Sequence, residues 1–343
     1  MSVFWHSNFM IRLRSWEYWP LQVVYFPIFF YWMWQAIRSG SLFFFSASNP
    51  SIESGGMLGE SKSKILDLIP DEVKPITLFF NKGVELEDMI TQFSQHQLTY
   101  PVIAKPDMGE RGWQVVKVKD EIALVNYAES STVDFIIQEY IDLPVELGVF
   151  YYRMPDEEQG VVSSIVLKEM LKVTGDGRST LRELMTKYDR AKLQITTLEK
   201  ERDLSVVPKS GEDVELVGIG NHSKGTTFLN GNQWITEKLI TQFDLLSKQV
   251  KGFYYGRYDL RCASREALER GEMKIMELNG AGAEPAHIYH PGFSLFRAYG
   301  VLFKHWKILA QISRANHKNG VAYLTLKEAK EIWSRIKAKE ALT

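Results

Sequence analysis

Acidic and amide side chains recur in the segments GRYD and MELNG at positions typical of a metal site. Arg257 and Asp259 are two residues apart, and so are Glu277 and Asn279 further along the chain. Since residues i and i+2 of a strand project from one face, each pair would point in a single direction. Carboxylate and amide oxygens suit Mg²⁺, which combines a few protein ligands with substrate phosphates. We therefore expect Asp259, Glu277 and Asn279 to hold a magnesium ion. The alternative is a salt bridge between strands, which explains less well why such residues interrupt an apolar strand before a Gly-rich turn.

A second candidate group lies in the segment IAKPDMGERG. An expected strand delivers Lys105 and then gives way to a loop that contains Gly109 and Gly112. Glycines allow backbone N–H groups to approach phosphate oxygens closely, and a lysine supplies a positive charge to them. The spacing is not that of a P-loop, and an ordinary β-turn is an equally simple explanation of the segment alone.

A third group could contact a nucleoside. An extended link at Gln138, Glu139, Tyr140 and Ile141 can offer backbone N–H and C=O groups to the edge of an adenine. Glu146 follows seven residues after Glu139 and could accept the two ribose hydroxyls. Acidic residues are common on protein surfaces, so this group also needs the others to support it.

Taken in order over about residues 100–291, these groups resemble the ATP-grasp superfamily of carboxylate–amine ligases. The segments GRYD, MELNGAG and HIYHP are similar to those of D-alanine–D-alanine ligases. VTGDGRSTLRELM and NHSKGTTF are more similar to those of cyanophycin synthetase and glutathione ligase relatives. The resemblance implies an α+β (α/β) ATP-grasp fold whose two lobes clasp ATP, with Mg²⁺ (or Mn²⁺) as the metal. It also implies a ligase that activates a small carboxylate as an acyl phosphate and joins it to an amine.

The resemblance further implies a role for each matching residue. Lys105 and Lys168 match the lysines that hold ATP phosphates, and Arg257 with the backbone at Gly282 matches groups that stabilise a tetrahedral intermediate. The remaining matches are Asp107, Gly109, Arg111 and Gly112 in the flap over the phosphates, Gln138, Glu139, Tyr140 and Ile141 at the adenine hinge, Glu146 at the ribose, and Asp259, Glu277 and Asn279 at Mg²⁺. A phosphotransferase that stops before ligation and an inactive membrane-associated scaffold are the alternatives to a ligase.

Two features depart from D-alanine ligases. The region before Tyr100 is short and aromatic compared with their complete substrate domain, and Arg111 and Trp113 stand where a serine-rich flap is expected. Both features argue against D-alanine as the substrate. Arg111 could pair with an anionic substrate or a phosphate, or be an ordinary loop arginine. Further candidates for contact with the substrate, each with a purely structural role as its alternative, are His222, Lys224, Glu284, His287 and His290.

Composition limits the class of protein. Of the 343 residues, 45% are hydrophobic and 24% charged, as in ordinary globular proteins. The formal net charge of −1 argues against nucleic acid as a partner, because such proteins usually carry a basic stripe. Cys262 is the single cysteine, so no disulfide can form within the chain, which suits the cytoplasm. We expect Cys262 in the core, since the implied mechanism needs no protein nucleophile.

The segment from Trp19 to Ile37 contains no formally charged residue, and Arg12, Arg14 and Arg38 flank it. One interpretation is a helix that is buried or forms a homodimer. Another is a helix that lies on the inner face of the membrane, where Trp and Tyr are favoured. A membrane span is the third, because about 20 apolar residues are needed to cross a bilayer.

The sequence suggests four regions: an aromatic N-terminal segment (1–40), a short β/α section (41–99), an ATP-grasp domain (100–310, with lobes 100–145 and 146–310) and a helical tail (311–343). Single strands are expected over residues 41–45, 76–80, 100–106, 114–125, 135–141, 253–263 and 273–280, and a pair of strands is expected within 148–171. Expected helices cover 61–69, 84–96, 179–204, 234–251 and 293–316.

Overall fold

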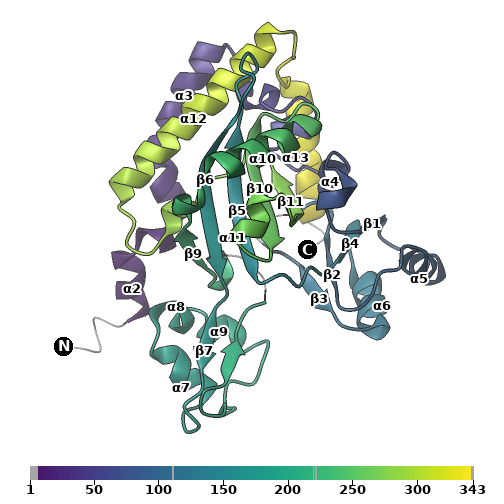
Figure 1. Cartoon of the computed structure of the whole chain (residues 1–343), viewed down its shortest axis with the longest axis vertical. Helices are drawn as coiled ribbons and strands as arrows, with labels where there is room; N and C mark the ends of the chain where they lie inside the picture. The colour runs from purple at the N-terminus through teal and green to yellow at the C-terminus, as the bar shows by residue number, and fades with distance from the viewer. Residues whose placement is uncertain (1–6, 110–111, 219, 221, 341–343) are drawn as a thin grey trace.

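The computed structural model describes residues 7–109, 112–218, 220 and 222–340. Helices and antiparallel sheets are mixed, which confirms the α+β class predicted from the sequence (Figure 1). The strands are β1 (Thr77–Phe80), β2 (Val102–Pro106), β3 (Val116–Val118), β4 (Phe135–Glu139), β5 (Val145–Tyr152), β6 (Val161–Glu169), β7 (Lys172–Thr174), β8 (Asp213–Glu215), β9 (Thr227–Asn230), β10 (Tyr255–Cys262) and β11 (Met273–Asn279). The helices are α2 (Asn8–Arg14), α3 (Leu21–Ser39), α4 (Lys62–Leu66), α5 (Leu86–Gln95), α6 (Glu121–Ser130), α7 (Leu181–Thr186), α8 (Asp189–Lys192), α9 (Ile195–Leu198), α10 (Glu237–Gln249), α11 (Arg265–Glu269), α12 (Leu295–Lys318) and α13 (Leu326–Glu340).

The larger sheet has five antiparallel strands in the order β11-β10-β5-β6-β9. Its strands alternate, so that one face is apolar and packs against α4, α10 and α11. Arg257 lies opposite Asn279, and Asp259 lies opposite Glu277, in the register of β10 and β11. This pairing confirms that the two strands are neighbours and that these four residues share a region of the sheet.

The smaller sheet has four antiparallel strands in the order β1-β4-β2-β3. Val102 and Ala104 of β2 face α5 and α6 in an apolar core. Ile103 and Lys105, at the alternate positions, face the larger sheet across a cleft. The two sheets therefore have largely separate cores, joined by Ile136 of β4, which packs in the core of the larger sheet. Their other faces lie toward each other.

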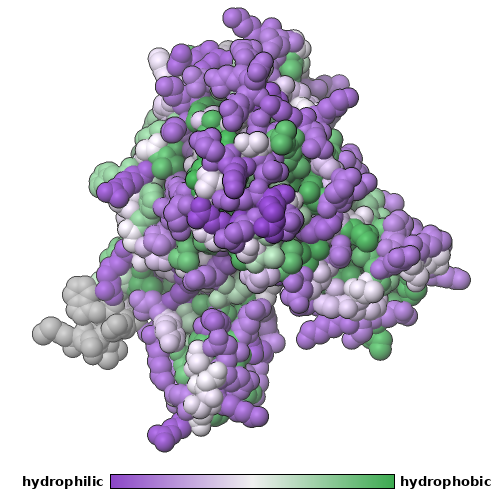
Figure 2. Space-filling view, viewed as in Figure 1, coloured by the Kyte–Doolittle hydropathy of each residue, from purple (hydrophilic) through white to green (hydrophobic). Residues whose placement is uncertain are grey.

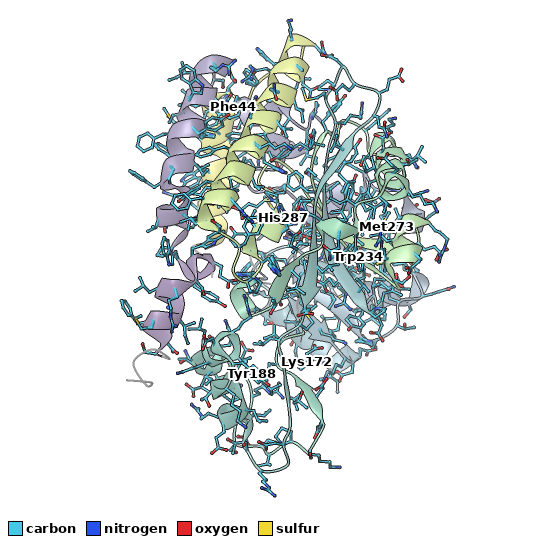
Figure 3. The ribbon with its side chains drawn as sticks, turned by 60° about the vertical axis from the view of Figure 1, so that its left-hand side comes forward. Phe44, Lys172, Tyr188, Trp234, Met273 and His287 are labelled. Atoms are coloured by element: carbon cyan, nitrogen blue, oxygen red, sulfur yellow. The ribbon has the colours of Figure 1, made fainter. Side chains whose placement is uncertain are left out.

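A helical layer covers part of the cleft-side face of the larger sheet. Helices α3 and α12 lie side by side at the outer edge of the molecule (Figures 1 and 3). Phe44 lies between them and is fully buried, and its ring contacts those of Trp32 on α3 and Trp306 on α12. The aromatic N-terminal segment is thus docked on the sheet domain through its inner side.

A small lobe projects from the end of the larger sheet and consists of β7, β8 and the short helices α7, α8 and α9 (Figure 1). Thr180 caps α7 in a capping box with Glu183. The region 179–204 was predicted to be helical, and it is divided into three short helices.

Two predicted strands are wrong. Residues 41–45 form no strand, and residues 44–47 are a 3-10 turn whose phenylalanines are buried beside α12. The alternation at 114–125 is a strand only at β3. Asp120 then caps α6 by accepting the N–H of Ala123, so the apolar residues that follow are helical.

The predicted region boundaries do not coincide with breaks in the structure. β1 precedes Tyr100 but pairs with β4 along its whole length. Helix α12 runs without interruption through residue 310. The division into four regions stays a prediction.

Within the described ranges, none of the helices has the length and apolarity required to cross a bilayer, which contradicts the membrane span considered for residues 19–37.

Candidate active site in the cleft between the two sheets

A cleft of about 1240 Å³ lies between the sheets. In the space-filling view the surface is hollowed between the projecting lobe and the lobe that carries the smaller sheet (Figure 2). Most residues predicted from the sequence line this one cleft: Lys105, Gly109, Gly112, Gln138, Glu139, Tyr140, Ile141, Glu146, Lys168, Arg257, Asp259, Glu277, Asn279 and Gly282. Arg111 lies outside the described residues, and Asp107 lines a different hollow. Groups far apart in the sequence are thus brought to one place.

Asp259 is the centre of a buried network on the larger sheet. Its carboxylate accepts two hydrogen bonds from the Arg257 guanidinium, at 3.1 and 2.9 Å, and one from the Asn279 amide at 3.0 Å. The Lys168 ammonium lies 3.4 Å away. Burial alone would raise the pKa of Asp259, but Arg257 and Lys168 hold it at about 2. The carboxylate is therefore ionised at any physiological pH.

Gly148 is required beneath this network. A Cβ atom at residue 148 would lie 2.9 Å from Oδ1 of Asp259 and 3.0 Å from Cδ of Arg257. β5 therefore leaves room for the ion pair on the neighbouring strand β10.

Glu146 belongs to the same network and is held by two cations. Arg261 donates to its Oε2 at 3.0 and 2.7 Å, and Lys168 donates to Oε1 at 3.3 Å. Burial opposes the charge of Lys168, but Asp259 and Glu146 outweigh it, so the pKa of Lys168 lies above its usual value. Arg261 was missed by the sequence analysis, although its position two residues after Asp259 on the same strand face could have revealed it.

Lys105 reaches the cleft from the smaller sheet and has only neutral hydrogen-bond partners among the described residues. Its ammonium donates to Oε1 of Gln138 at 3.0 Å and to the carbonyl of Met276 on β11 at 3.4 Å. Gln138 in turn donates to Thr77 and to the same carbonyl. Burial lowers the pKa of Lys105 to about 8, although Glu277 attracts its charge. Lys105 and Gln138 thus join the two sheets at the back of the cleft.

The predicted metal ligands are only partly available to an ion. Within the described ranges, no three His, Cys, Asp or Glu side chains are grouped as metal ligands. Both carboxylate oxygens of Asp259 accept hydrogen bonds from the Arg257 guanidinium. The Asn279 side chain donates its N–H to Asp259, so its amide oxygen points away from that carboxylate. The Glu277 side chain lines the cleft, and its carboxylate has no hydrogen bond or ion pair with another described side chain. The donor set suits Mg²⁺ in type, but full coordination requires Asp259 to release Arg257.

The loop after Lys105 is fixed by α4. Asp107 is buried, and its carboxylate accepts the N–H of Ser63 at 2.8 Å. The Lys62 ammonium donates to the carbonyl of Gly109 at 2.6 Å. Asp107 therefore has a structural role here, anchoring the loop rather than facing the cleft. Lys62 lines the cleft and was missed, because nothing in the sequence connects it to the loop.

The predicted adenine hinge is partly occupied by the protein itself. The Glu139 N–H donates to the carbonyl of Ile76 at 2.8 Å, and its carboxylate accepts the Ile76 N–H at 3.1 Å. The carbonyl of Ile141 accepts a hydrogen bond from Arg261 at 3.1 Å. The Lys117 ammonium lies over the Tyr140 ring, 3.5 Å from its centroid.

The N–H of Gly282 is also engaged. It donates to the carbonyl of Gly56 at 2.8 Å, where the loop of residues 55–57 packs tightly on the turn after β11. The role implied for the Gly282 backbone would require this bond to break.

The candidate residues for substrate contact divide into two groups. The first group has partners within the protein. His287 is buried between α12 and the sheet (Figure 3), and its Nδ1 lies 2.6 Å from Oγ of Ser164. His290 accepts a hydrogen bond from the N–H of Asn230. Glu284 and His222 line the cleft, and burial raises the pKa of Glu284. Lys224 does not line it. Cys262 is buried in the core, as predicted.

The N-terminal segment forms part of the cleft wall, which the sequence analysis did not foresee. Trp16 and Glu17 line the cleft, and the Trp16 indole donates to the carbonyl of Phe293 at 2.6 Å. Glu17 accepts hydrogen bonds from Arg190 at 2.6 Å and pairs with His222 at 2.8 Å. Burial opposes the charge of Glu17, but these two partners lower its pKa overall.

Comparisons with known proteins give a partial likeness. No protein-family model matches the sequence, and no curated protein matches it. D-alanine–D-alanine ligase from Bacillus anthracis aligns over 76% of this chain and 67% of its own, at 14% identity and a TM-score of 0.41. VanG D-Ala:D-Ser ligase from Enterococcus faecalis aligns over 72% and 61%, at 14% identity and 0.41. A bifunctional glutathione synthetase from Pasteurella multocida aligns over 73% and 38%, at 13% identity and 0.32. The chain thus spans less than two thirds of the last two proteins. At TM-scores this low, the interpretation of the site rests on its own residues.

Proposed function

We propose that the cleft binds ATP and uses it to activate a small carboxylate, which an amine then attacks, as in ATP-grasp ligases. The observation that carries the proposal is the convergence of Lys105 from one sheet with Lys168, Arg257 and Asp259 from the other. A triphosphate needs several cations held at fixed positions, and two facing sheets supply them from both sides.

The central group of the cleft combines four cations with three carboxylates. Lys105, Lys168, Arg257 and Arg261 lie among the carboxylates of Glu146, Asp259 and Glu277. Further acids line the rest of the cleft, so the positions of these cations, and not the net charge, would hold the phosphates. Glu277, Asn279 and Asp259 would hold the magnesium ion, which neutralises charge on the transferred phosphoryl group when bound. Glu146 would face the ribose, provided that Arg261 shifts.

In the proposed reaction a substrate carboxylate oxygen attacks the γ-phosphorus, and the bond to ADP breaks. The amine nitrogen then attacks the acyl carbon, phosphate leaves with the C–O bond electrons, and the amine loses a proton. Arg257, which lies beside Asp259 at the wall of the cleft, would stabilise the oxyanion that forms at the acyl carbon. Lys105 would bind the phosphates directly, and Lys168 would contribute less, because Glu146 and Asp259 already pair with it.

The test is incubation of the full chain with ATP, Mg²⁺, a pool of carboxylic acids and hydroxylamine. We expect phosphate release together with hydroxamate, and loss of both in Asp259→Ala but not in Asp156→Ala, which changes an exposed acid outside the cleft. ATP turnover without hydroxamate would support a phosphotransferase instead. Absence of turnover, with nucleotide affinity unchanged in Asp259→Ala, would support an inactive scaffold.

The outer face of α3 supports a second role, contact with a membrane surface. Phe26, Phe29, Phe30 and Trp34 are between 54% and 64% exposed, and Ile37 is 70% exposed. Together they form an exposed apolar face on α3, and a contiguous face of this kind is typical of a surface that contacts a partner or a membrane. Arg12 and Arg38 are exposed beyond the two ends of this patch and would complement anionic lipid headgroups.

This role is tested by flotation with vesicles that contain phosphatidylserine. We expect the chain to float with the vesicles, and the double variant Phe26→Ser, Phe30→Ser to stay in solution. Ile122→Ser, which changes an exposed apolar residue on α6, is the matched control and should still float. A chain that ignores vesicles but sediments as a dimer, with the dimer lost in the double variant, would assign the face to a homodimer and overturn the membrane role.

A further inference from the structure

The polarity of the cleft changes along strand β10. Tyr255, Arg257, Asp259 and Arg261 are alternate residues of this strand, and all four line the cleft. Arg261 and Asp259 belong to the charged network, and Arg257 is its last member. The Tyr255 ring packs instead against Phe150, with ring centroids 4.9 Å apart. At the start of β10, before Arg257, the same strand face is therefore apolar.

The far end of the cleft is lined by apolar side chains from three parts of the chain. We name this part the apolar chamber; it is lined by Val24, Tyr25, Met57, Leu302, Trp306 and Leu309. Trp306 lies between two apolar clusters, one around Ile28 and Leu302 and the other around Phe44 and Leu309. The chamber is therefore continuous with the core on both sides, and its walls are well supported.

The N-terminal wall of the chamber is held in place by specific contacts. The Trp16 indole donates to the carbonyl of Phe293, and Glu17 is paired with Arg190 of the projecting lobe and with His222. These contacts tie residues 16–18 to two separate regions, just before α3 begins. The wall of the chamber is therefore held in place by contacts within the chain, as is usual for binding pockets.

His305 supplies an independent observation. It lines the cleft, is 4% exposed and packs edge-on against Phe150. Its Nδ1 has no hydrogen-bond partner among the described residues. Burial lowers the pKa of His305 to about 3, so the ring is neutral. The buried His305 ring is therefore a neutral part of the cleft wall and offers no cation to a second carboxylate.

We propose that the apolar chamber binds the body of an apolar carboxylic acid, aromatic or aliphatic, whose carboxylate lies at Arg257. The position of the carboxylate rests on the proposed function. The chamber side chains carry no charge, so a second carboxylate there would be buried without a partner. A very small acid would leave the apolar walls in contact with water instead of ligand. The chamber thus selects acids by apolar area.

The proposal is tested by direct binding to the full chain without ATP, measured by calorimetry and by the fluorescence of its tryptophans. The probes are acetate, butanoate, hexanoate, octanoate and 3-phenylpropanoate, with butanedioate and hexanedioate as matched dicarboxylates. We expect affinity to rise about fourfold per methylene group until the chamber is full. The dicarboxylates should bind at least about tenfold more weakly than the monoacids of equal length. Affinity that is independent of chain length, or equal for both series, would overturn the proposal.

Variants separate the chamber from the exposed face of α3, which could also take up apolar acids. Trp306→Ala should weaken octanoate binding about tenfold or more. Trp34→Ala removes the same side chain from the outer face, does not touch the cleft and should bind normally. Tyr25→Ala, on a different wall, gives a second measurement if Trp306→Ala does not fold. Loss of binding in Trp34→Ala alone would place the acid on the outer face and contradict the chamber.

Nucleotide binding, measured separately with a fluorescent ATP analogue, distinguishes this proposal from the proposed function. Length-dependent acid binding without nucleotide binding would sink the ligase proposal and leave the chamber standing. ATP turnover that is stimulated by acetate and amino-dicarboxylates, but not by longer apolar acids, would sink the chamber alone.

Discussion

Lys105 and Lys168 face the same cleft from different sheets, and their surroundings are opposite. Lys168 lies between two carboxylates, Glu146 and Asp259, and its pKa is raised above the usual value. Lys105 has an amide oxygen and a peptide carbonyl as its partners, and burial lowers its pKa to about 8. Both ammonium groups are buried to a similar extent, so the difference comes from the partners and not from exposure.

The comparison separates two tasks that buried cations perform. A cation between carboxylates stabilises them and is itself neutralised, so it adds little attraction for a ligand. A buried cation with neutral partners keeps its charge at a free-energy cost, which a phosphate would relieve. We therefore expect Lys168 to contribute mainly to stability and Lys105 mainly to nucleotide binding.

Asp259→Ala should have the largest effect, because it breaks the network on which Lys168 depends. Arg257 would lose its only described carboxylate partner, and Lys168 would keep Glu146 alone. We expect the free energy of unfolding to fall by about 3–5 kcal/mol, as for other buried ion pairs that lose one member. Urea denaturation followed by circular dichroism measures the loss. A fall of less than about 1 kcal/mol in the free energy of unfolding is typical of exposed ion pairs. Such a result would mean that water reaches the network and that Asp259 does not neutralise Lys168.

Methionine at each lysine tests the comparison directly. In Lys168→Met, Glu146 keeps Arg261 and Asp259 keeps Arg257, so we expect a loss of about 1–3 kcal/mol in stability. In Lys105→Met the buried charge disappears, and stability should be unchanged or higher. Nucleotide affinity should fall about 10- to 100-fold in Lys105→Met, because a charge-assisted hydrogen bond to phosphate is lost.

Denaturation and titration with a fluorescent nucleotide give both quantities for the two variants. The opposite ranking, in which Lys105→Met is the less stable protein and Lys168→Met the weaker binder, would reverse the assignment of the two tasks.

The pH dependence of nucleotide binding distinguishes the lysines without changing stability much. The folded pKa of Lys105 is about 8, below the value of 10.5 for an unperturbed lysine. As the pH rises above 8, Lys105 loses its proton in the folded chain, and nucleotide affinity should fall by up to about tenfold per pH unit. Between these two pKa values the unfolded chain binds more protons, so the contribution of Lys105 to stability rises with pH.

Lys105→Arg provides the control for this titration, because a guanidinium keeps its proton throughout the range. Its nucleotide affinity should be flat between pH 7 and 9. An equal fall in both proteins would show that another group titrates.

Much of the site could be predicted from strand alternation. Spacing alone placed Arg257 with Asp259 and Glu277 with Asn279, and the register of β10 and β11 brings the pairs together. The spacing of residues along a strand could not predict which groups these side chains and backbone N–H groups would hydrogen-bond. Asn279 donates to Asp259 instead of leaving both groups open to a metal, and the Gly282 N–H is taken by Gly56, more than two hundred residues earlier. These outcomes depend on packing between distant segments.

The same limit explains the errors in the fold. The residues from 41 to 45 have strand composition, but they pair with no described strand, and Phe44 and Phe45 are buried beside α12 instead. Residues 121–125 are mostly apolar and could continue the strand, yet Asp120 is a good helix cap and decides the local structure. The contribution of Trp16 and Glu17 to the cleft wall has no signal in the sequence at all, since it depends on contacts with Phe293, Arg190 and His222.

Thr77→Val should have the smallest effect and tests how the neutral surroundings of Lys105 are maintained. Thr77 accepts a hydrogen bond of 3.1 Å from the Gln138 amide, whose oxygen accepts from Lys105. Without Thr77 the amide still donates to the Met276 carbonyl at 3.3 Å, so Gln138 should keep its orientation. We expect stability to fall by less than about 1 kcal/mol and the pH midpoint of nucleotide binding to stay in place. Gln138→Leu removes the oxygen itself and should lower both the pKa of Lys105 and that midpoint. Equal shifts in the two variants would mean that Thr77 orients Gln138, and that β1 helps to keep the pKa of Lys105 from falling further.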